Sequence, residues 1–212
     1  MKALARPGVV PYISAWSGEQ PFRRPIVYDA ARGGIGYADE TPEDRDQYGV
    51  LWNGRTVAQG VGRPEYGNPH PQRQREAMQH LLCQGCRCPR DDDPRGVLWL
   101  LEDRRGDWAG WPNNLLTAHP PSCAPCIVKM RDSCPHLAET GHVAVRARSS
   151  EVCAVYGRLW APSAFGVPVR TPKKDVVAYG SPAARWVLAG QLVRSLHDCT
   201  VVDLERELAR HP

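Results

Sequence analysis

The chain has 212 residues, of which 42% are hydrophobic and 24% are charged. These values are typical of a globular protein and provide enough apolar surface for one sizeable domain or two small ones. The longest uncharged apolar run is much shorter than the roughly 20 residues of a membrane-spanning helix, so we expect no membrane partner. The N-terminal residues have no apolar stretch of the kind found in secretory signals. The sequence therefore predicts a cytoplasmic protein, in which paired cysteines bind metal more often than they form disulfides.

The net charge of +4 gives little support for nucleic-acid binding, because it is not concentrated near the paired cysteines. Residues 83–141, which contain those cysteines, carry seven basic and eight acidic side chains. Phosphate binding needs clustered positive charge. The chain also contains 23 Arg against 4 Lys. We attribute this ratio to the coding bias of a high-GC genome, which inflates any count of basic patches.

Residues 1–71 are predicted to form a β-rich region of short strands and tight turns. An acidic segment at residues 39–46 is interpreted as a solvated turn; its carboxylates would also suit a divalent cation, although the spacing of an EF-hand is absent. Three prolines in residues 63–71 predict a rigid connector without regular structure. Apolar or β-branched runs bounded by Gly, Pro and Asp predict strands at residues 9–13, 25–28 and 48–52.

Residues 72–141 are predicted to form a zinc-binding module. Apolar residues at helical spacing predict a helix over residues 72–82, which leads directly into a first cysteine pair. A strand is expected at residues 97–101. A second helix is expected at residues 126–131, where it begins within a second cysteine pair.

Residues 142–212 are predicted to form a β-hairpin followed by helices, with strands at residues 142–148 and 152–160. Ser181-Pro182 is typical of a helix start, since a capping hydroxyl precedes proline at the first helical position. A broad apolar stripe then continues to Leu196, and Thr200-Val201-Val202-Asp203 resembles a capping box that opens a last helix to about Ala209. The elements together predict an α+β fold whose three regions pack as one globular unit.

Two Cys-x-x-Cys units, separated by 36 residues, predict a metal site. The two residues between the thiols of each unit let both sulfur atoms of a tight turn reach one ion, and two such turns complete the four-sulfur tetrahedron that zinc prefers. Gly85 is expected to ease the first turn, where a positive φ is often needed. The N–H groups at the start of the second helix favour thiolates in the second unit. We therefore predict Zn²⁺ bound by Cys83, Cys86, Cys123 and Cys126.

Other roles for the ligand cysteines stay open at the level of the sequence. The second unit has the Cys-x-Pro-Cys pattern of redox dithiols, although two prolines, and not a strand, precede it. Cys88 is an alternative ligand in place of Cys83 or Cys86. His80 also competes as a ligand, although on the predicted helix it is expected to face solvent.

Further cysteines have less specific interpretations. Cys134 and His136 follow the second unit, and we interpret them as a buried thiol that closes the helix beside a capping histidine, with a second metal site as the alternative. Cys153 and Cys199 stand alone in apolar settings and are expected in the core.

The order of elements in residues 73–130 resembles a treble-clef zinc module, in the zinc-bearing version found in HNH-type nucleases. That family has a helix, a Cys-x-x-Cys knuckle, a strand, an Asn-Leu pair and a second knuckle that opens a helix, and Asn114-Leu115 lies where the family has its Asn-Leu. The resemblance implies a treble-clef-like module beside a small sheet and C-terminal helices. The strand end reads Leu101-Glu102-Asp103-Arg104-Arg105 and lacks the family's catalytic histidine, so we interpret the kinship as structural.

The whole chain also resembles proteins of high-GC actinobacteria, which implies a cytoplasmic bacterial protein and no particular activity. A complete zinc shell without a catalytic set favours a zinc-stabilised, non-catalytic protein that binds a protein or nucleic-acid partner. The alternative hypothesis is a metal-dependent, nuclease-like enzyme in which His119 acts with Asp103 or Glu102.

Overall fold

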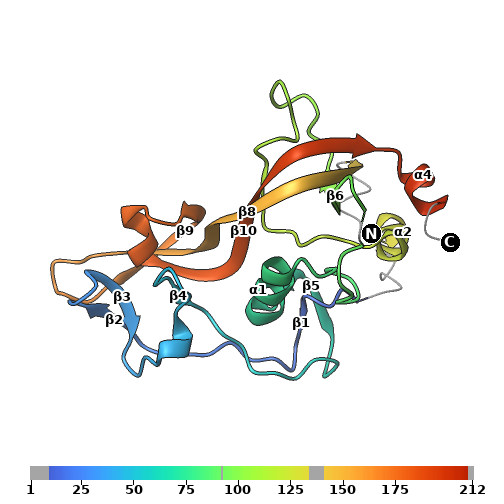
Figure 1. Ribbon diagram of the computed structural model, residues 1–212. Helices are drawn as coiled ribbons and strands as arrows, with labels where there is room; N and C mark the ends of the chain where they lie inside the picture. The colour runs from blue at the N-terminus through green and yellow to red at the C-terminus, as the bar shows by residue number, and fades with distance from the viewer. Residues whose placement is uncertain (1–9, 92, 134–140, 210–212) are drawn as a thin grey trace, which may run out of the picture. The chain divides into compact units, whose positions relative to one another are not determined.

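The computed structural model describes residues 10–91, 93–133 and 141–209 (Figure 1). The chain divides into two compact units, each assembled from segments that are distant in the sequence. Unit 1 contains the segment that ends at Ser14, Glu76–Val152 and the segment that begins at Arg194. Unit 2 contains Ala15–Arg75 and Cys153–Val193.

The predicted α+β class is confirmed. The described residues contain the helices α1 (Pro71–His80), α2 (Ala124–Ser133) and α4 (Leu204–Ala209) together with ten strands. Two strands are long, β8 (His142–Ala161) and β10 (Val187–Val202), and each contributes residues to both units. None of the described helices has the length and apolar character needed to cross a membrane.

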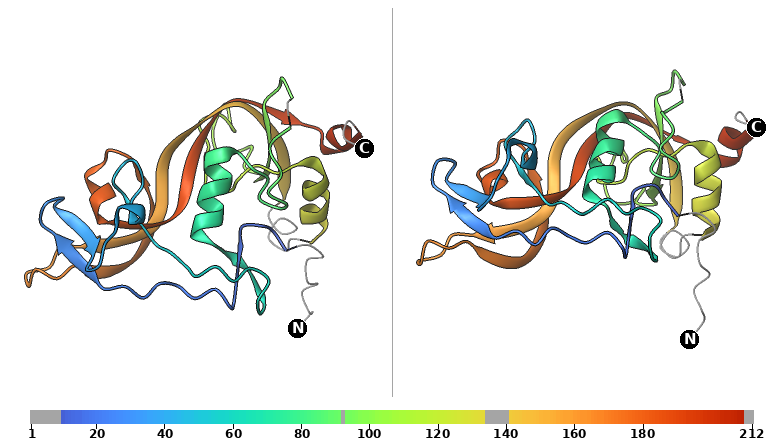
Figure 2. Two further views of the ribbon diagram at one scale, coloured as in Figure 1. Left: turned by 60° about the horizontal axis from the view of Figure 1, so that its bottom comes forward. Right: turned by 90° about the horizontal axis from the view of Figure 1, so that it is seen from below.

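Unit 1 is built around an antiparallel pair of strands covered by helices (Figure 2). β6 (Val97–Glu102) pairs with the first part of β8, and β7 (Leu116–Thr117) pairs with the last part of β10. α2 packs on the β6–β8 pair, and α4 adds Leu204 and Leu208 to the same apolar cluster. The buried members of this cluster are Leu98, Leu100, Ala124, Ile127 and Ala144.

A buried ion-pair network also links the elements of unit 1. Arg146, on β8, is fully buried and donates hydrogen bonds to Glu207 in α4 (2.9 Å), to Asp91 (2.6 Å) and to the carbonyl oxygen of Gly96 (2.7 Å). The Glu207 carboxylate also accepts a hydrogen bond from Arg95. A buried charge that is paired and fully hydrogen-bonded is tolerated, whereas a single unpaired one is costly. The network therefore ties α4 to the sheet.

Unit 2 contains the second part of β8 and the first part of β10. β9 (Val169–Ala178) pairs antiparallel with β8, and β4 (Leu51–Trp52) pairs parallel with β10. β2 (Ile26–Asp29) and β3 (Gly34–Tyr37) form a separate hairpin. The apolar core of unit 2 contains Ile35 and Tyr37 of β3 and Leu51 of β4. These residues pack against Trp160, Trp186 and Leu188.

Two buried polar groups position the loops of unit 2. The Glu19 carboxylate accepts hydrogen bonds from both terminal nitrogens of Arg73 (2.6 and 2.7 Å) and from the backbone N–H of Trp16 (2.9 Å). The side-chain amide of Gln74 accepts a hydrogen bond from the backbone N–H of Leu192 (2.8 Å) and donates one to its carbonyl oxygen (2.9 Å). Gln74 therefore takes the place of a neighbouring strand at that point of β10.

Several predicted elements are confirmed with small shifts. The helix predicted at residues 72–82 is α1, which ends before Leu81 because that residue has a positive φ of 53°. The strand at 97–101 is β6, the helix at 126–131 is α2, and the strand at 25–28 is β2. The last helix is α4, although Thr200 lies in β10 and only Asp203 acts as a cap, through a 2.9 Å hydrogen bond from the Arg206 N–H.

The helix predicted to run from Ser181 to Leu196 is wrong. After a short 3-10 turn at Pro182–Trp186, the chain continues as the strand β10. The sequence pattern is misleading because no residue of β10 from Val187 to His197 is exposed on either face, so apolar residues occur in runs and not at every second position. Its β-branched residues favour the extended conformation.

The predicted hairpin between residues 142–148 and 152–160 is also wrong, because both segments belong to the single strand β8. β8 changes partners along its length: residues 142–147 pair with β6, and residues 154–161 pair with β9. The exposed polar residues Arg148, Ser149 and Glu151, which resemble a turn in the sequence, lie between these two pairings. A local pattern does not reveal such a change of partner.

Two predictions for the N-terminal region need correction. The connector predicted at residues 63–71 contains the strand β5 (Pro64–Pro69), which pairs with β1 (Ser14–Trp16). Prolines are tolerated there because they lie at the ends of a strand in a two-stranded sheet. The strand predicted at residues 9–13 is not observed in its described part, residues 10–13, which leads through a turn into β1.

Candidate metal centre

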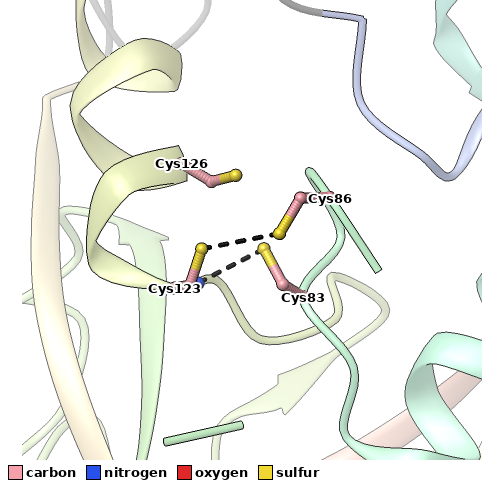
Figure 3. Close-up of side chains that lie close together, drawn as sticks. All are labelled: Cys83, Cys86, Cys123 and Cys126. Atoms are coloured by element: carbon pink, nitrogen blue, oxygen red, sulfur yellow. Dashed lines mark hydrogen bonds between the residues drawn. The ribbon is translucent and has the colours of Figure 1, made fainter. Parts of the chain in front are cut away.

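The sulfur atoms of Cys83, Cys86, Cys123 and Cys126 lie within 4.8 Å of one another, and Figure 3 shows all four pointing toward one small space. The Sγ atoms of Cys86 and Cys123 are 3.7 Å apart. Four thiolates around a zinc ion at a Zn–S distance of about 2.3 Å have sulfur atoms about 3.8 Å apart. The structure therefore brings the four predicted ligands to a geometry that can hold a metal ion.

The first cysteine pair lies in a tight turn that follows α1. Leu82 and Pro89 pair across the turn, and the N–H of Cys83 donates to the carbonyl oxygen of Cys88 (2.8 Å). The N–H of Arg87 donates back to the carbonyl oxygen of Cys83 (2.9 Å). These bonds fold the chain so that both thiols emerge on the same side.

The role predicted for Gly85 is wrong in its mechanism. The residue of this turn with a positive φ is Arg87, at 66°, and not Gly85. Gly85 is required for space: a Cβ atom at this position would lie 2.7 Å from the Sγ of Cys126. The absence of a side chain therefore lets the first turn approach the second cysteine pair.

The second cysteine pair lies at the start of α2. Cys123 immediately precedes the helix, and its carbonyl oxygen accepts hydrogen bonds from the N–H groups of Cys126 and Ile127, both at 3.0 Å. Ile127 is fully buried in the apolar cluster of unit 1. The helix start is thus fixed to the sheet, and with it the positions of both thiols.

Backbone and side-chain bonds also join the two turns directly. Gln84, between the first two cysteines, donates from its N–H to the carbonyl oxygen of Pro121 (2.8 Å) and from its side-chain amide to the hydroxyl oxygen of Ser122 (2.9 Å). The carbonyl oxygen of Gly85 accepts a hydrogen bond from the N–H of Tyr12 (2.9 Å). Gln84 and Ser122 were not expected in the site, because a polar residue beside a cysteine does not show in the sequence that the two side chains meet.

Hydrogen bonds within the cluster favour a thiolate at Cys83. Its sulfur accepts hydrogen bonds from the N–H groups of Gly85 and Cys123, both at 3.3 Å. Hydrogen bonds from the neighbouring thiols of Cys123 and Cys126, and from the N–H groups of Cys123 and Cys86, hold the pKa of Cys83 far below its usual range. The pKa of Cys126 is raised by its hydrogen bonds with the thiols of Cys123 and Cys83 and by burial. At Cys123 a hydrogen bond with Cys126 lowers the pKa, but Cys83 and burial outweigh it, so that the pKa is also raised. Four thiolates at this spacing need a cation.

The other candidate ligands lie outside the cluster. Cys88 and His80 are exposed, and neither belongs to a group of three or more metal-binding side chains among the described residues. Cys153 and Cys199 are only half-buried and not fully in the core. Cys134 and His136 lie outside the described residues.

The residues of the alternative nuclease site are not brought together as a metal-binding group in the described part of the chain. Glu102 forms an ion pair with Arg104 (2.9 Å), and Asp103 forms one with Arg105 (2.6 Å). His119 is exposed near the end of β7. The carboxylates are thus engaged by neighbouring arginines.

The acidic segment at residues 39–46 is not simply a solvated turn. Glu40 forms a two-point ion pair with Arg45, and Arg24 donates to both Asp39 (2.8 Å) and Asp44 (2.5 Å). The segment lines an open pocket of about 690 Å³. The carboxylates of Asp39, Glu40 and Asp44 are thus paired with arginines, and no group in the segment meets the geometry of a metal site among the described residues.

No family model matches this sequence, and neither curated proteins nor solved structures include a match to it. The function therefore has to be argued from the site itself.

Proposed function

We propose that the protein is a zinc-stabilised, non-catalytic binding protein in which Cys83, Cys86, Cys123 and Cys126 hold one structural Zn²⁺. The observation that carries the proposal is the convergence of four thiols from two turns, 36 residues apart, within 4.8 Å. Zinc is the metal best suited to four sulfur ligands in a tetrahedron.

The ligand set favours a structural role over catalysis. Structural zinc sites have four protein ligands, whereas catalytic sites keep one position for water or substrate. Here the four thiols would fill the shell, with Cys83 and Cys126 buried, Cys123 half-buried and Cys86 exposed. Four protein ligands would leave no coordination position for water or substrate.

The ion would fix three segments of unit 1 to one another. The first turn follows α1, the second turn begins α2, and the segment at Tyr12 bonds to Gly85 between them. The two cysteine-bearing turns are short and have no regular backbone pairing with a sheet in the described chain, so metal binding would supply much of the free energy that fixes them. A protein or nucleic-acid partner would bind to surfaces of the protein whose conformation depends on the bound ion. The proposal includes a reducing compartment such as the cytoplasm, in which the four thiols stay reduced.

The proposal is tested by measuring the zinc content and melting temperature of the purified chain and of the variants C83S and C126S. Each variant is expected to lose most of its bound zinc and to melt at a much lower temperature, because zinc affinity is part of the folding free energy.

Cys88→Ser is the matched control, since this cysteine lies two residues from Cys86 and outside the cluster. It should keep one zinc ion per chain and the melting temperature of the original protein. Full zinc content in C83S, or loss of zinc in C88S, would overturn the proposed ligand set.

A further inference from the structure

The hairpin formed by β8 and β9 in unit 2 is unusually basic for this chain. Residues 154–178 contain four basic side chains and one acidic side chain, although the net charge of all 212 residues is only +4. Arg158 lies directly opposite Lys174 in the pairing of the two strands. The segment also contains two of the four lysines of the protein. Much of the net positive charge of the protein therefore lies in this hairpin and not in the cysteine-rich segment.

The connection between β8 and β9 is a hydrogen-bonded turn (Figure 1). The hydroxyl group of Ser163 donates to the carbonyl oxygen of Val167 (2.6 Å) and accepts from the N–H of Phe165 (3.3 Å). The N–H of Gly166 donates to the carbonyl oxygen of Ser163 (3.2 Å), and Gly166 has a positive φ of 73°. Prolines at 162 and 168 restrict the chain on both sides.

This turn presents apolar side chains to solvent. Phe165 is 92% exposed, the highest value among the large hydrophobic residues of the described chain, and Val167 and Val169 are exposed to 62% and 52%. A fixed turn that keeps a phenylalanine in water loses the free energy that burial would provide, about 1.5–3 kcal/mol. Exposed apolar side chains gathered on one short segment are typical of interaction sites.

We propose that this hairpin binds single-stranded nucleic acid, with Arg170, Lys173 and Lys174 on phosphates and Phe165 stacked on an unpaired base. The inference rests on the proposed function and names its partner.

Three features favour this partner. Exposed cationic side chains attract a polyanion, and an exposed aromatic ring on the same hairpin gives an unpaired base a surface for stacking. The site contains one acidic group, Asp175, which is paired with Lys173 at 2.5 Å. Lysine and proline in an edge strand also discourage pairing with other strands, but that role does not require an exposed phenylalanine at the tip.

The experiment measures the binding of the zinc-loaded full-length chain to a fluorescent oligonucleotide of about 20 nucleotides, longer than the ~4–16 nucleotides that one module covers. Phe165→Ala should weaken the affinity about tenfold, within the range known for loss of one stacked base. Val57→Ala removes an equally exposed apolar side chain (86%) elsewhere in unit 2 and should leave the affinity unchanged.

A salt titration tests the phosphate contacts. The double variant K173A/K174A should reduce the slope of log K against log [salt] by about 1.4, since each phosphate contact on a single strand contributes about 0.7. The matched control R104A/R105A removes two adjacent, exposed arginines that are paired with acidic neighbours, as Lys173 is. It should leave the slope unchanged.

Several outcomes would overturn the inference: equal affinity for F165A and the original protein, binding of a blunt duplex as tight as that of the single strand, or binding of phosphatidylserine vesicles without binding of the oligonucleotide. Zinc content is measured in every sample. A chain with one zinc ion that fails to bind the oligonucleotide refutes the hairpin assignment alone, whereas a zinc-free chain refutes the proposed function.

Discussion

The two units hold their loops in place by different chemistry. In unit 1 two turns converge on four sulfur atoms. In unit 2 the loops converge on the buried carboxylate of Glu19, which binds the N–H of Trp16 and the side chain of Arg73. The backbone carbonyl oxygen of Glu19 also accepts from Arg55 (2.9 Å). A thiol cluster depends on a metal ion, whereas a carboxylate cluster depends on pH, so the two units should respond to different perturbations.

Removal of the metal should produce the largest difference between the units. With a strong chelator, amides at residues 82–90 and 122–130 should lose protection from hydrogen exchange, because zinc contributes on the order of 10 kcal/mol to the folding of small zinc modules. Amides at residues 16–19, held by Glu19, should keep their protection. Exchange measured by mass spectrometry reports both regions in one sample, and equal loss of protection in both would contradict the comparison.

The second effect concerns the ion-pair network of unit 1, which needs no metal. Glu207→Ala removes one of the two carboxylates that are hydrogen-bonded to the buried Arg146, the other being Asp91, and should lower the free energy of unfolding by about 3 kcal/mol. Glu205→Ala changes an exposed glutamate of the same helix and should lower it by no more than about 0.5 kcal/mol. Urea unfolding measures both values. A similar effect of the two variants would show that the network does not stabilise α4.

The third effect is the dependence of unit 2 on pH. Burial opposes the charge on Glu19, but hydrogen bonds from Arg73 and from the N–H of Trp16 lower its pKa from 4.5 to about 2. A lowered pKa means that the ionised carboxylate stabilises the folded state. This contribution, about 3 kcal/mol, is complete above pH 4.5 and is lost as the pH falls toward 2.

Glu19→Gln removes this contribution. The difference in unfolding free energy between the original protein and E19Q should therefore be largest near pH 7 and should shrink between pH 4.5 and pH 2. Urea unfolding at several pH values provides the measurement. A difference that stays constant over this range would mean that the Glu19 charge does not stabilise unit 2.

The smallest effect should come from Gly85→Ala. The added Cβ atom would lie 2.7 Å from the Sγ of Cys126, so the two turns must move apart slightly. Zinc affinity, measured by competition with a chelator, should fall about tenfold, as is typical when groups around the ligands are altered. Gly106→Ala adds a methyl group where no atom lies within 4 Å and should leave the affinity unchanged. Equal zinc affinities of the original protein and Gly85→Ala would show that the added Cβ atom fits without moving the turns.

The sequence predicts unit 1 better than unit 2, and the reason lies in the kind of signal each contains. Cys-x-x-Cys spacing, the helical pattern of α1 and the apolar run of β6 are local, so each can be recognised within a few residues. The buried carboxylate of Glu19 has no such signal, because its partner Arg73 is 54 residues away in the chain.

The predicted C-terminal helix shows where a local pattern fails. Val187, Leu188, Leu192, Val193 and Leu196 fit a helical stripe, yet they lie in β10, where no residue of this stretch is exposed on either face. Local hydrophobicity cannot separate the two cases without knowledge of the neighbouring strands. The metal site escapes this ambiguity, since its evidence is the chemical identity of the ligands and not their periodicity.

Gln74 has a consequence for the edge of the strand β10. Its amide occupies both backbone groups of Leu192, one as acceptor and one as donor. Asparagine is one methylene shorter, and an ionised glutamate has no hydrogen to give. Neither replacement can both donate to and accept from Leu192 as Gln74 does, so this edge of β10 is closed by one specific side chain and not by a further strand.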